Sequence, residues 1–505
     1  MLNRMLRKTT REYPRKTAVV YGETRLSYTE LERMAEGLAA ELFERGIKQS
    51  GCVAMLLPNC PEFLVGFYAT ARLNAISLPL NPMLKSDELA HYFEDSKAGA
   101  VITDASHVGV CKGAIAQLDR NIELIAIDGD SPSVLPFAKF LDDDSPIEEK
   151  ADLYEGDVLY AYSSGSTGRP KQVCRTQKNL VSEANNFTTT TECTSEDNIL
   201  CVVPLFHAHG MGNCLLAATR TGATLAILEP VTKEGKTVDV PFVFRRDRVL
   251  ELIEQERVTV VPGVPYIFSA LAESPKAKPI DSMRLVFSAG NFLSREVFDK
   301  FADSFGIPIR QLYGCTEAGS VTINLEPVSG LQPDSIGLPL GNVEMTIVDD
   351  DGKEMPVNVS GEILFKSPAL TDGYRNMPEL NKDAFKDGAF LTGDLGKRDD
   401  QGRFYITGRK KIFIDQGGYK VDPFEVEDVL SAHPKVEEAV VVGVKGPYEG
   451  EIIKAVIVAN GECEKREIVA YCKERLAEFK IPKIVEFREE IPKSPLGKIL
   501  RKDLV

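Results

Sequence analysis

The stretch Ser163-Ser164-Gly165-Ser166-Thr167-Gly168-Arg169-Pro170-Lys171 follows the strand-like run Leu159–Tyr162. Its glycines let successive backbone N–H groups face one point, and its hydroxyl groups and two cations add further contacts for an anion. A loop of this kind after a strand predicts a cradle for a polyphosphate. It is not the G-x-x-x-x-G-K-[ST] loop, because no Gly-Lys-Ser/Thr occurs at that spacing. A flexible surface linker is the simpler alternative for such a composition.

Helix-like and strand-like segments alternate on both sides of this loop, from about residue 26 to 320. Ser27 and Glu30 form a capping box that starts a helix ending near Gly46. Such alternation predicts parallel sheets covered by helices, an α/β fold. Further helices are expected to open at Pro61 and to cover 87–95, 210–220, 244–256, 265–273 and 294–305, and strands to cover 52–57, 77–80, 100–103, 199–203, 224–228, 258–261, 284–288 and 309–312.

Two further segments of the chain have different sequence patterns. Residues 321–405 contain short apolar runs split by Asp-Gly and Pro turns, which predicts a small β-rich, barrel-like region. Residues 409–505 mix strands and helices and predict a separate α+β lid. A chain of 505 residues exceeds a single ordinary core, so we expect a large N-terminal domain over 1–408 and a C-terminal domain over 409–505. Residues 128–150 are expected to form a surface loop.

Composition restricts the class of protein. A net charge of -15 disfavours nucleic acid as a partner, because phosphate backbones repel an acidic surface. The ten cysteines include no C-x-x-C pair, which favours reduced thiols in a cytoplasmic protein. No apolar stretch follows the charged N-terminus and no run of about 18 apolar residues occurs, so neither a secretory signal nor a membrane span is expected. Peripheral contact with a membrane stays open.

Seven segments, taken in order, resemble those of the acyl-adenylate-forming superfamily, which includes acyl-CoA synthetases, firefly luciferase and the adenylation domains of peptide synthetases. The resemblance covers nearly the whole chain. It implies ATP, Mg²⁺ and coenzyme A as cofactors, and a reaction in which a carboxylic acid becomes an acyl-adenylate and then a thioester. The segments are the loop at 163–171, PLFHAHG at 204–210, YGCTEAG at 313–319, LTGD at 391–394, GRKK at 408–411, GGYKVDPFEVE at 417–427 and PLGKILR at 495–501.

The resemblance also implies roles in nucleotide binding. Glu317 and Thr167 would hold Mg²⁺, which prefers one or two carboxylates plus phosphate oxygens. Thr316 would contact the α-phosphate, Tyr313 would stack near adenine, and Asp394 and Arg409 would contact the ribose. The alternatives are a helix N-cap at Thr316, an Asx-turn at Asp394 and a solvated charge at Arg409. The full implied set is Ser163, Ser164, Gly165, Ser166, Thr167, Gly168, Lys171, Ala289, Gly290, Asn291, Tyr313, Gly314, Cys315, Thr316, Asp394 and Arg409.

Two lysines and a glycine pair resemble functional residues of the family's mobile C-terminal domain. Lys498 resembles the lysine that bridges the substrate carboxylate and the α-phosphate, although a lysine in a chain-end loop is usually only solubilising. Lys411 matches the hinge about which the lid changes orientation. Gly417-Gly418-Tyr419 would then pass a thin pantetheine arm, unless the glycines form an ordinary turn.

The resemblance narrows the acid as well. Amino-acid-activating members carry an Asp where this chain has Phe206-His207, so an amino acid is disfavoured. His207, Met211, Tyr266 and Asn291 map to the acyl pocket, with His207 as a gate beside the carboxylate. These side chains favour an uncharged fatty or aromatic acid, because no mapped position supplies the arginine that a dicarboxylate would want. His209 is expected to pack or cap.

Some residues depart from the family pattern, and some alternatives stay open. Gln172 replaces a usual Gly, and Asn291-Phe292 replace a common Ala-Pro in the adenine loop. The acceptor is coenzyme A or, alternatively, the phosphopantetheine arm of a carrier protein. A non-catalytic AMP-binding sensor is a third reading, against which Thr316, Glu317, Asp394, Arg409 and Lys498 argue. The sequence leaves the acid's identity and the oligomeric state open.

Overall fold

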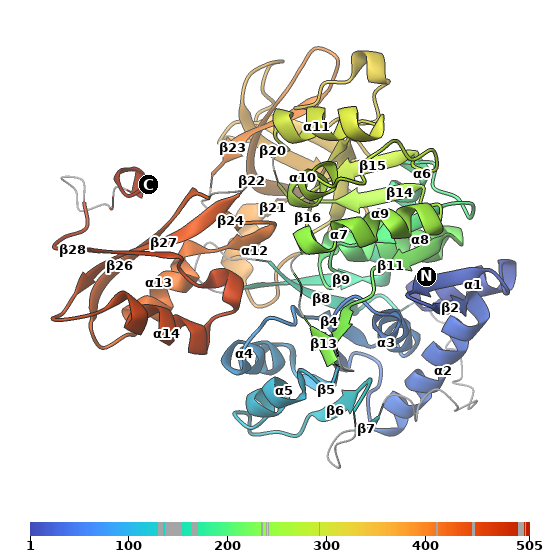
Figure 1. The fold of residues 1–505 in the computed structure, drawn as a ribbon, viewed down its shortest axis with the longest axis horizontal. Helices are drawn as coiled ribbons and strands as arrows, with labels where there is room; N and C mark the ends of the chain where they lie inside the picture. The colour runs from blue at the N-terminus through green and yellow to red at the C-terminus, as the bar shows by residue number, and fades with distance from the viewer. Residues whose placement is uncertain are drawn as a thin grey trace.

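The computed structural model consists of a large body and a smaller C-terminal lobe beside it (Figure 1). The structure describes residues 1–129, 135–136, 154–163, 170–233, 236–238, 240, 242–291, 293–410, 413–446, 450–492, 499 and 501–505.

The larger main sheet is parallel in its interior and antiparallel at its edges. Its order is β18 (Leu338–Pro339), β17 (Gly319–Ile323), β16 (Arg310–Cys315), β15 (Leu285–Ser288), β14 (Val260–Gly263), β10 (Asn198–Cys201), β11 (Thr224–Ile227), β1 (Thr17–Tyr21) and β2 (Thr24–Ser27). The strands from β16 through to β1 pair in parallel, whereas β2, β17 and β18 pair antiparallel. The interior therefore has the arrangement that the alternation predicted.

A second main sheet contains the strands on either side of the Ser/Gly-rich loop. Its order is β7 (Leu135–Pro136), β6 (Glu123–Ala126), β5 (Ala98–Thr103), β3 (Cys52–Leu56), β4 (Ile76–Pro79), β8 (Asp157–Ser163) and β9 (Lys171–Thr176). Its pairs are parallel except β8 with β9. Most of the loop expected at 128–150 lies outside the described residues.

Helices connect these strands and cover the sheets (Figure 1). The capping box is confirmed: Ser27 accepts from the Glu30 backbone and donates back to its carboxylate at the start of α2 (Tyr28–Glu44). The other helices of the body are α1 (Met5–Glu12), α3 (Pro61–Arg72), α4 (Ser86–Ser96), α5 (Val108–Ile115), α6 (Gln177–Thr190), α7 (Ala208–Gly210), α8 (Ala217–Thr221), α9 (Arg246–Gln255), α10 (Pro265–Ala272), α11 (Arg295–Phe305) and α12 (Pro378–Ala384).

The helices differ from the sequence prediction in two ways: one expected helix is divided, and α1, α5, α6 and α12 were not expected. The helix expected over 210–220 is divided, because a π-helical turn, η3 (Met211–Leu216), separates α7 from α8. Helix α6 was not predicted at all. Its Asn- and Thr-rich sequence has low helix propensity, so burial of one face, including Leu180, Ala184 and Phe187, is what stabilises it.

The last parts of the chain are built on smaller sheets. A half-barrel sheet contains β19 (Glu344–Val348), β20 (Gly361–Lys366), β22 (Ala389–Arg398), β21 (Phe385–Lys386) and β23 (Phe404–Arg409), in agreement with the predicted β-rich region. The lobe has its own hydrophobic core, which includes Ile414, Val426 and Ile457. Its elements are β24 (Ile414–Gln416), β25 (Tyr419–Val421), α13 (Pro423–Ser431), β26 (Val436–Lys445), β27 (Glu451–Ala459), α14 (Lys465–Arg475), η6 (Glu478–Lys480) and β28 (Ile484–Arg488).

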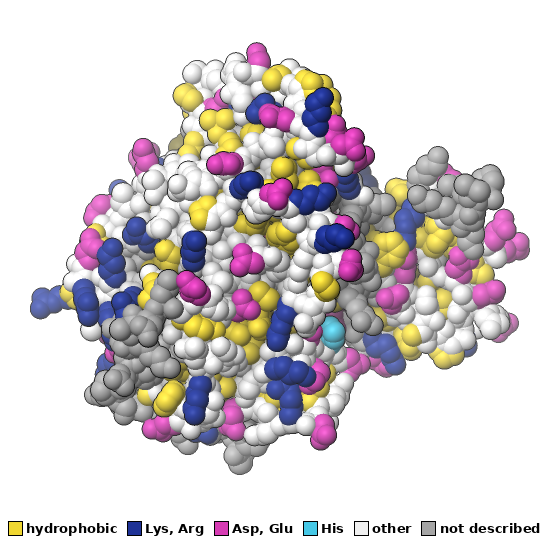
Figure 2. Space-filling view, turned by 180° about the vertical axis from the view of Figure 1, so that it is seen from behind, with side chains coloured by type: hydrophobic (Ala, Val, Ile, Leu, Met, Phe, Trp, Pro, Cys, Tyr) yellow, Lys and Arg dark blue, Asp and Glu magenta, His cyan; other side chains and the backbone are white. Residues whose placement is uncertain are grey.

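The surface carries mixed charge. Figure 2 shows acidic and basic side chains interspersed over the face seen from behind, with the small lobe projecting at one side. Within the described part of the chain, none of the helices has both the length and the apolar character needed to cross a bilayer. All ten cysteines fall in the described residues and are unpaired.

Candidate active site

The Ser/Gly-rich loop joins two paired strands. Ser163 at the end of β8 pairs with Lys171 at the start of β9, so the two ends of the loop are held together. Ser164, Gly165, Ser166, Thr167 and Gly168 lie outside the described residues. The buried Ser163 Oγ has no hydrogen-bond partner among the described residues. A buried hydroxyl without a partner is costly, so this position suits an oxygen of a bound ligand.

Glu317 lies in the turn between β16 and β17, close to the strand that begins with Lys171. It is 6% exposed, and its Oε1 accepts a hydrogen bond from Tyr374 Oη at 2.6 Å. The ammonium of Lys171 lies 4.6 Å from the centre of the same Tyr374 ring. Tyr374 therefore brings the cation of one motif and the carboxylate of another to the same place. Thr316 and Glu317 lie in a β-turn, so the alternative of a helix N-cap at Thr316 is wrong.

The short β-turn at Glu317 depends on two glycines. A Cβ at Gly314 would lie 2.5 Å from the carbonyl oxygen of Gly319, and Gly319 itself has φ +73°. Only glycine tolerates both the close approach and the left-handed backbone. Cys315, the last residue of β16, is partly buried.

Two candidate nucleotide contacts are joined directly. Tyr313 Oη donates to Asp394 Oδ2 at 2.6 Å. Burial, reinforced by the charge of Asp394, raises the pKa of Tyr313, so the phenol stays protonated and remains a donor. Asp394 lies within β22 and pairs with Arg409 of β23, so the Asx-turn alternative is wrong. The side chain of Arg409 lies outside what the structure describes.

The expected adenine loop lies against the lobe. Ala289 is buried, and Gly290 has φ +86° with open space around the position of a Cβ. Asn291 Nδ2 donates to Asp415 Oδ1 of the lobe at 2.9 Å. The amide of Asn291, which we expected in the acyl pocket, is thus engaged at the contact between body and lobe. Phe292 is not among the described residues.

The Gly417-Gly418 pair forms the turn between β24 and β25. Gly417 has φ +62° and Gly418 φ +101°, and Gly418 N donates to Asp415 Oδ1 at 3.0 Å. A Cβ at Gly418 would meet Val264 Cγ2 of the body at 4.0 Å, and Tyr419 stacks on Phe479 at 4.5 Å. The hairpin of the lobe therefore lies directly against the body. Lys411 and Lys498 lie outside the described residues.

The histidine segment lies at the same side of the body. The exposed side chain of His207 caps α7, and its Nδ1 accepts from His209 N at 3.3 Å. Desolvation by the protein atoms packed around the ring lowers the pKa of His207, and the positive charge of Lys420 in the lobe lowers it further. The lobe hairpin and His207 are therefore neighbours in this arrangement.

Beside this segment is a cavity of about 280 Å³, including its mouth. Met211 lines it as expected for the acyl pocket, whereas Tyr266 packs edge-on against Phe242, with ring centres 6.2 Å apart, and is not part of the lining. The sequence analysis missed two charged residues of the lining, Arg175 and Glu183. The lining includes Arg175, Glu183, Phe206, Ala208, Met211 and Thr316.

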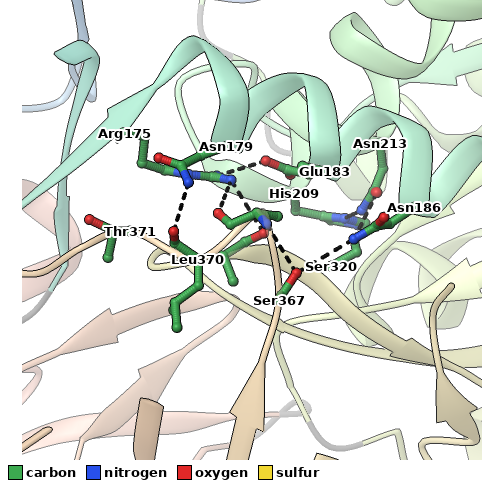
Figure 3. Close-up of polar contacts among 12 residues, drawn as sticks. Arg175, Asn179, Glu183, Asn186, His209, Asn213, Ser320, Ser367, Leu370 and Thr371 are labelled. Atoms are coloured by element: carbon green, nitrogen blue, oxygen red, sulfur yellow. Dashed lines mark hydrogen bonds and ion pairs between the residues drawn. The ribbon is translucent and has the colours of Figure 1, made fainter. Parts of the chain in front are cut away.

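Arg175 and Glu183 form a buried ion pair. Arg175 Nη1 lies 2.7 Å from Glu183 Oε2, and each side chain is 2% exposed (Figure 3). Burial raises the pKa of Glu183, while Arg175 acts in the opposite direction. A pocket arginine is therefore present, contrary to the mapping from sequence, but its charge is compensated. The spacing Arg175…Glu183 across an unpredicted helix gave no signal that could have found the pair.

Next to the pair, a second polar chain connects α7, η3 and β17 (Figure 3). His209 Nε2 lies 3.1 Å from Gly263 O, and Asn213 Nδ2 lies 2.9 Å from His209 Nδ1. Ser320 Oγ donates to Asn213 Oδ1 at 2.8 Å. Burial, with a smaller effect of His207, lowers the pKa of His209 to about 4, so the ring is neutral near pH 7. Asn213 lies in the π-helical turn, a feature often found at functional sites.

Comparison with known proteins decides the family. The model of the AMP-binding enzyme family matches residues 6–375, and the model of its C-terminal domain matches residues 425–498. The chain belongs to the AMP-binding enzyme family. The resemblance seen in the seven segments is thereby confirmed, and the protein is an enzyme of the acid–thiol ligase class.

Curated relatives of this AMP-binding enzyme extend over almost the full chain. It is 31% identical to the probable CoA ligase CCL9 of Humulus lupulus, covering 99% of this chain and 95% of the relative. It is 32% identical to an oxalate–CoA ligase of Arabidopsis thaliana (99% and 97% covered) and 34% identical to a feruloyl-CoA synthase of Amycolatopsis sp (97% and 95%). Among solved structures, o-succinylbenzoate CoA synthetase of Bacillus subtilis matches with TM-score 0.87 and 27% identity over 99% of this chain and 98% of that chain.

The residues of this AMP-binding enzyme fit a divalent ion held partly by its substrate. The described residues contain no cluster of three or more His, Cys, Asp or Glu that could bind a metal alone. Glu317 offers one carboxylate, with Oε1 oriented by Tyr374. Mg²⁺ is commonly bound by one or two carboxylates together with phosphate oxygens, so this donor set fits a magnesium–nucleotide complex.

Proposed function

We propose that this enzyme is an AMP-forming acid–CoA ligase, which converts an acid and ATP to acyl-AMP and pyrophosphate and then transfers the acyl group to coenzyme A. The observation that carries the proposal is the meeting of Lys171 and Glu317 at Tyr374, next to Thr316, which lines the cavity. A cation and a metal-binding carboxylate on one side of an acid pocket are what adenylation requires. The relatives' names as CoA ligases support coenzyme A as the acceptor.

The first half-reaction needs positioning and charge stabilisation rather than a protein nucleophile, because the acid's own carboxylate attacks the α-phosphorus. Lys171 and Ser163, with the rest of residues 163–168, hold the triphosphate by charge and hydrogen bonds. Glu317 and Thr167 would hold Mg²⁺, which neutralises phosphate charge when bound. Thr316 contacts the α-phosphate, and Asp394, oriented by Tyr313, binds the ribose hydroxyls together with Arg409.

Adenine binding is assigned to the edge of β15 and to β16. Ala289, Gly290 and Asn291 form one wall through their backbone, and Tyr313, Gly314 and Cys315 form the other. Lys498 supplies the positive charge that bridges the carboxylate and the α-phosphate during adenylation.

The second half-reaction is assigned to the hairpin of the lobe that carries Gly417 and Gly418. Gly417 and Gly418 leave room for the pantetheine arm, and Tyr419 flanks it. Their position against Val264 in this structure suits thioester formation. We place the boundary of the two domains at 408/409 and the hinge at Lys411.

The acid is proposed to be uncharged apart from its reacting carboxylate, with His207 as the gate and Met211 in the wall of the acyl pocket. The feruloyl-CoA synthase relative supports an aryl acid. A phosphopantetheine arm of a carrier protein remains the second candidate acceptor. The unpaired thiols support a cytoplasmic location.

The test is pyrophosphate–ATP exchange across short, medium, long and aryl acids, followed by thioester formation with coenzyme A or with a carrier protein. We expect acid-dependent exchange and a thioester on free coenzyme A. Thioester formed only on a carrier protein would reject coenzyme A as the acceptor, and a lack of exchange with every acid would reject the ligase itself.

A further inference from the structure

The Glu183 carboxylate, in the wall of the cavity, has one oxygen that lacks a hydrogen-bond donor among the described residues. Its Oε2 is taken by Arg175 Nη1 at 2.7 Å, but Oε1 has no hydrogen-bond partner among the described residues. The side chain is 2% exposed, so bulk water does not solvate it freely. A buried carboxylate oxygen without a donor is costly, and the cost falls when a ligand supplies the missing proton donor.

Two glycines make room for this oxygen beside the reacting end of the site. A Cβ at Gly212 would lie 1.9 Å from Glu183 Oε1, and a Cβ at Gly319 would lie 2.0 Å from it. Gly212 lies in the π-helical turn, and Gly319 follows the turn that carries Thr316 and Glu317. Glu183 Oε1 thus lies against both segments that border the cavity.

Arg175 holds the carboxylate in place and sets the local charge. Its Nη2 donates to Ala369 O at 2.9 Å and to Ala318 O at 3.3 Å, so the guanidinium is anchored on two loops. The pair has no net charge. It therefore offers little attraction to a second carboxylate or to an ammonium group on the substrate, but the free oxygen still accepts a neutral donor.

The neighbouring polar groups are engaged within the protein. Both ring nitrogens of His209 have partners, in Gly263 and Asn213, and Asn213 Oδ1 is engaged by Ser320. Within the described part of this ion pair, two buried atoms have no partner: the acceptor Glu183 Oε1 and the donor Arg175 Nε.

We propose that Glu183 Oε1 accepts a hydrogen bond from a hydroxyl group on the acid, so that the enzyme selects a hydroxy acid. The inference rests on the proposed function, since it names the substrate class of the same site. An acid with only hydrocarbon in this position leaves the oxygen without a donor. A site that hydrogen-bonds a hydroxyl discriminates against the analogue that lacks it.

The experiment compares matched acids in pyrophosphate–ATP exchange: 2-, 3- and 4-hydroxybenzoate against benzoate and 3-hydroxybutyrate against butyrate, with 3-aminobutyrate and succinate as charged analogues. We expect kcat/KM for at least one hydroxy acid to exceed that of its unsubstituted partner by roughly tenfold to a hundredfold, the range of a hydrogen bond to a charged group. The charged analogues are expected to be poorer than the hydroxy acid.

Two variants assign the preference to Glu183. E183Q keeps the shape but loses the charge, and the double variant R175M/E183M replaces the whole ion pair by apolar groups, which folded proteins often tolerate. R175M/E183M is expected to lower the hydroxy-to-unsubstituted ratio at least tenfold, and E183Q by a smaller factor, because its amide oxygen still accepts a hydrogen bond. D197N is the matched control: Asp197 is in a second ion pair, with Arg284 at 2.7 Å, and its loss should leave the ratio unchanged.

Equal use of hydroxylated and unsubstituted acids, better use of a charged analogue, or an unchanged ratio in R175M/E183M would each overturn the inference while leaving the ligase proposal intact. Lack of exchange with every acid would overturn both.

Discussion

Lys480 Nζ lies 2.7 Å from Glu88 Oε1, although 392 positions of sequence separate the two residues. The same ammonium is 2.7 Å from Glu425 Oε1, and Lys480 is only 6% exposed. Burial opposes the charge of Lys480, but Glu425 and Glu88 outweigh it and raise its pKa. Because Glu88 belongs to α4 of the body and the other two residues to the lobe, this cluster holds the lobe in the orientation that places Gly418 against Val264.

Replacing Lys480 by Met is expected to weaken this docking. Loss of charged hydrogen bonds at a buried position costs about 2 kcal/mol, which corresponds to roughly thirtyfold in the population of the docked orientation. We expect thioester formation from preformed acyl-AMP to slow, while pyrophosphate exchange changes little. Lys435→Met is the control, because its ion pair with Glu467 is exposed and within the lobe. Equal slowing of both half-reactions would contradict this role of the cluster.

Glu317→Gln is expected to lower pyrophosphate exchange by about a hundredfold and to raise the Mg²⁺ concentration needed for half-maximal rate, since an amide is a weaker ligand than a carboxylate. Tyr374→Phe removes the hydrogen bond to Oε1 but keeps the carboxylate, so a smaller loss is expected. A Mg²⁺ titration of both variants and the wild type provides the measurement. If E317Q responds to Mg²⁺ as the wild type does, Glu317 is not a metal ligand.

Lys498→Ala is expected to lose adenylation by about a hundredfold or more and still convert preformed acyl-AMP to thioester, because the role proposed for its charge belongs to the first half-reaction. Lys411→Ala should do the reverse if residue 411 is the hinge. Single-turnover assays of each half-reaction separate the two effects. Uniform losses in both variants would be incompatible with a lysine and a hinge that serve different steps.

Acid pH should weaken the fold through His209. Its pKa is about 4 in the folded protein, below the ordinary value of about 6.5, so the unfolded chain binds more protons between these values. The stabilising contribution of the neutral ring is complete above about pH 6.5 and is lost as the pH falls toward 4. Urea unfolding midpoints of wild type and His209→Gln, measured between pH 7.5 and 5, should show a smaller pH slope in the variant. Parallel slopes would mean that His209 is not buried in its neutral form.

Short-range features were predictable from sequence because their causes are local. The Ser27–Glu30 capping box, the proline that opens α3 and the alternating apolar runs each act within a few residues. The order of motifs identified the family for the same reason, since each motif is a contiguous segment. Helix α6 escaped prediction because tertiary burial, rather than its own propensity, stabilises it.

The sequence by itself determined the α/β class, the β-rich region, the α+β lobe and the family. The tertiary structure alone decided which distant side chains meet: Tyr374 with Glu317, Arg175 with Glu183, and Lys480 with Glu88. The physical reason is the distance along the chain over which each effect acts. Backbone preferences and periodicity are written within a few residues, whereas pairing of buried charges depends on how separate sheets and helices pack, which no local pattern encodes.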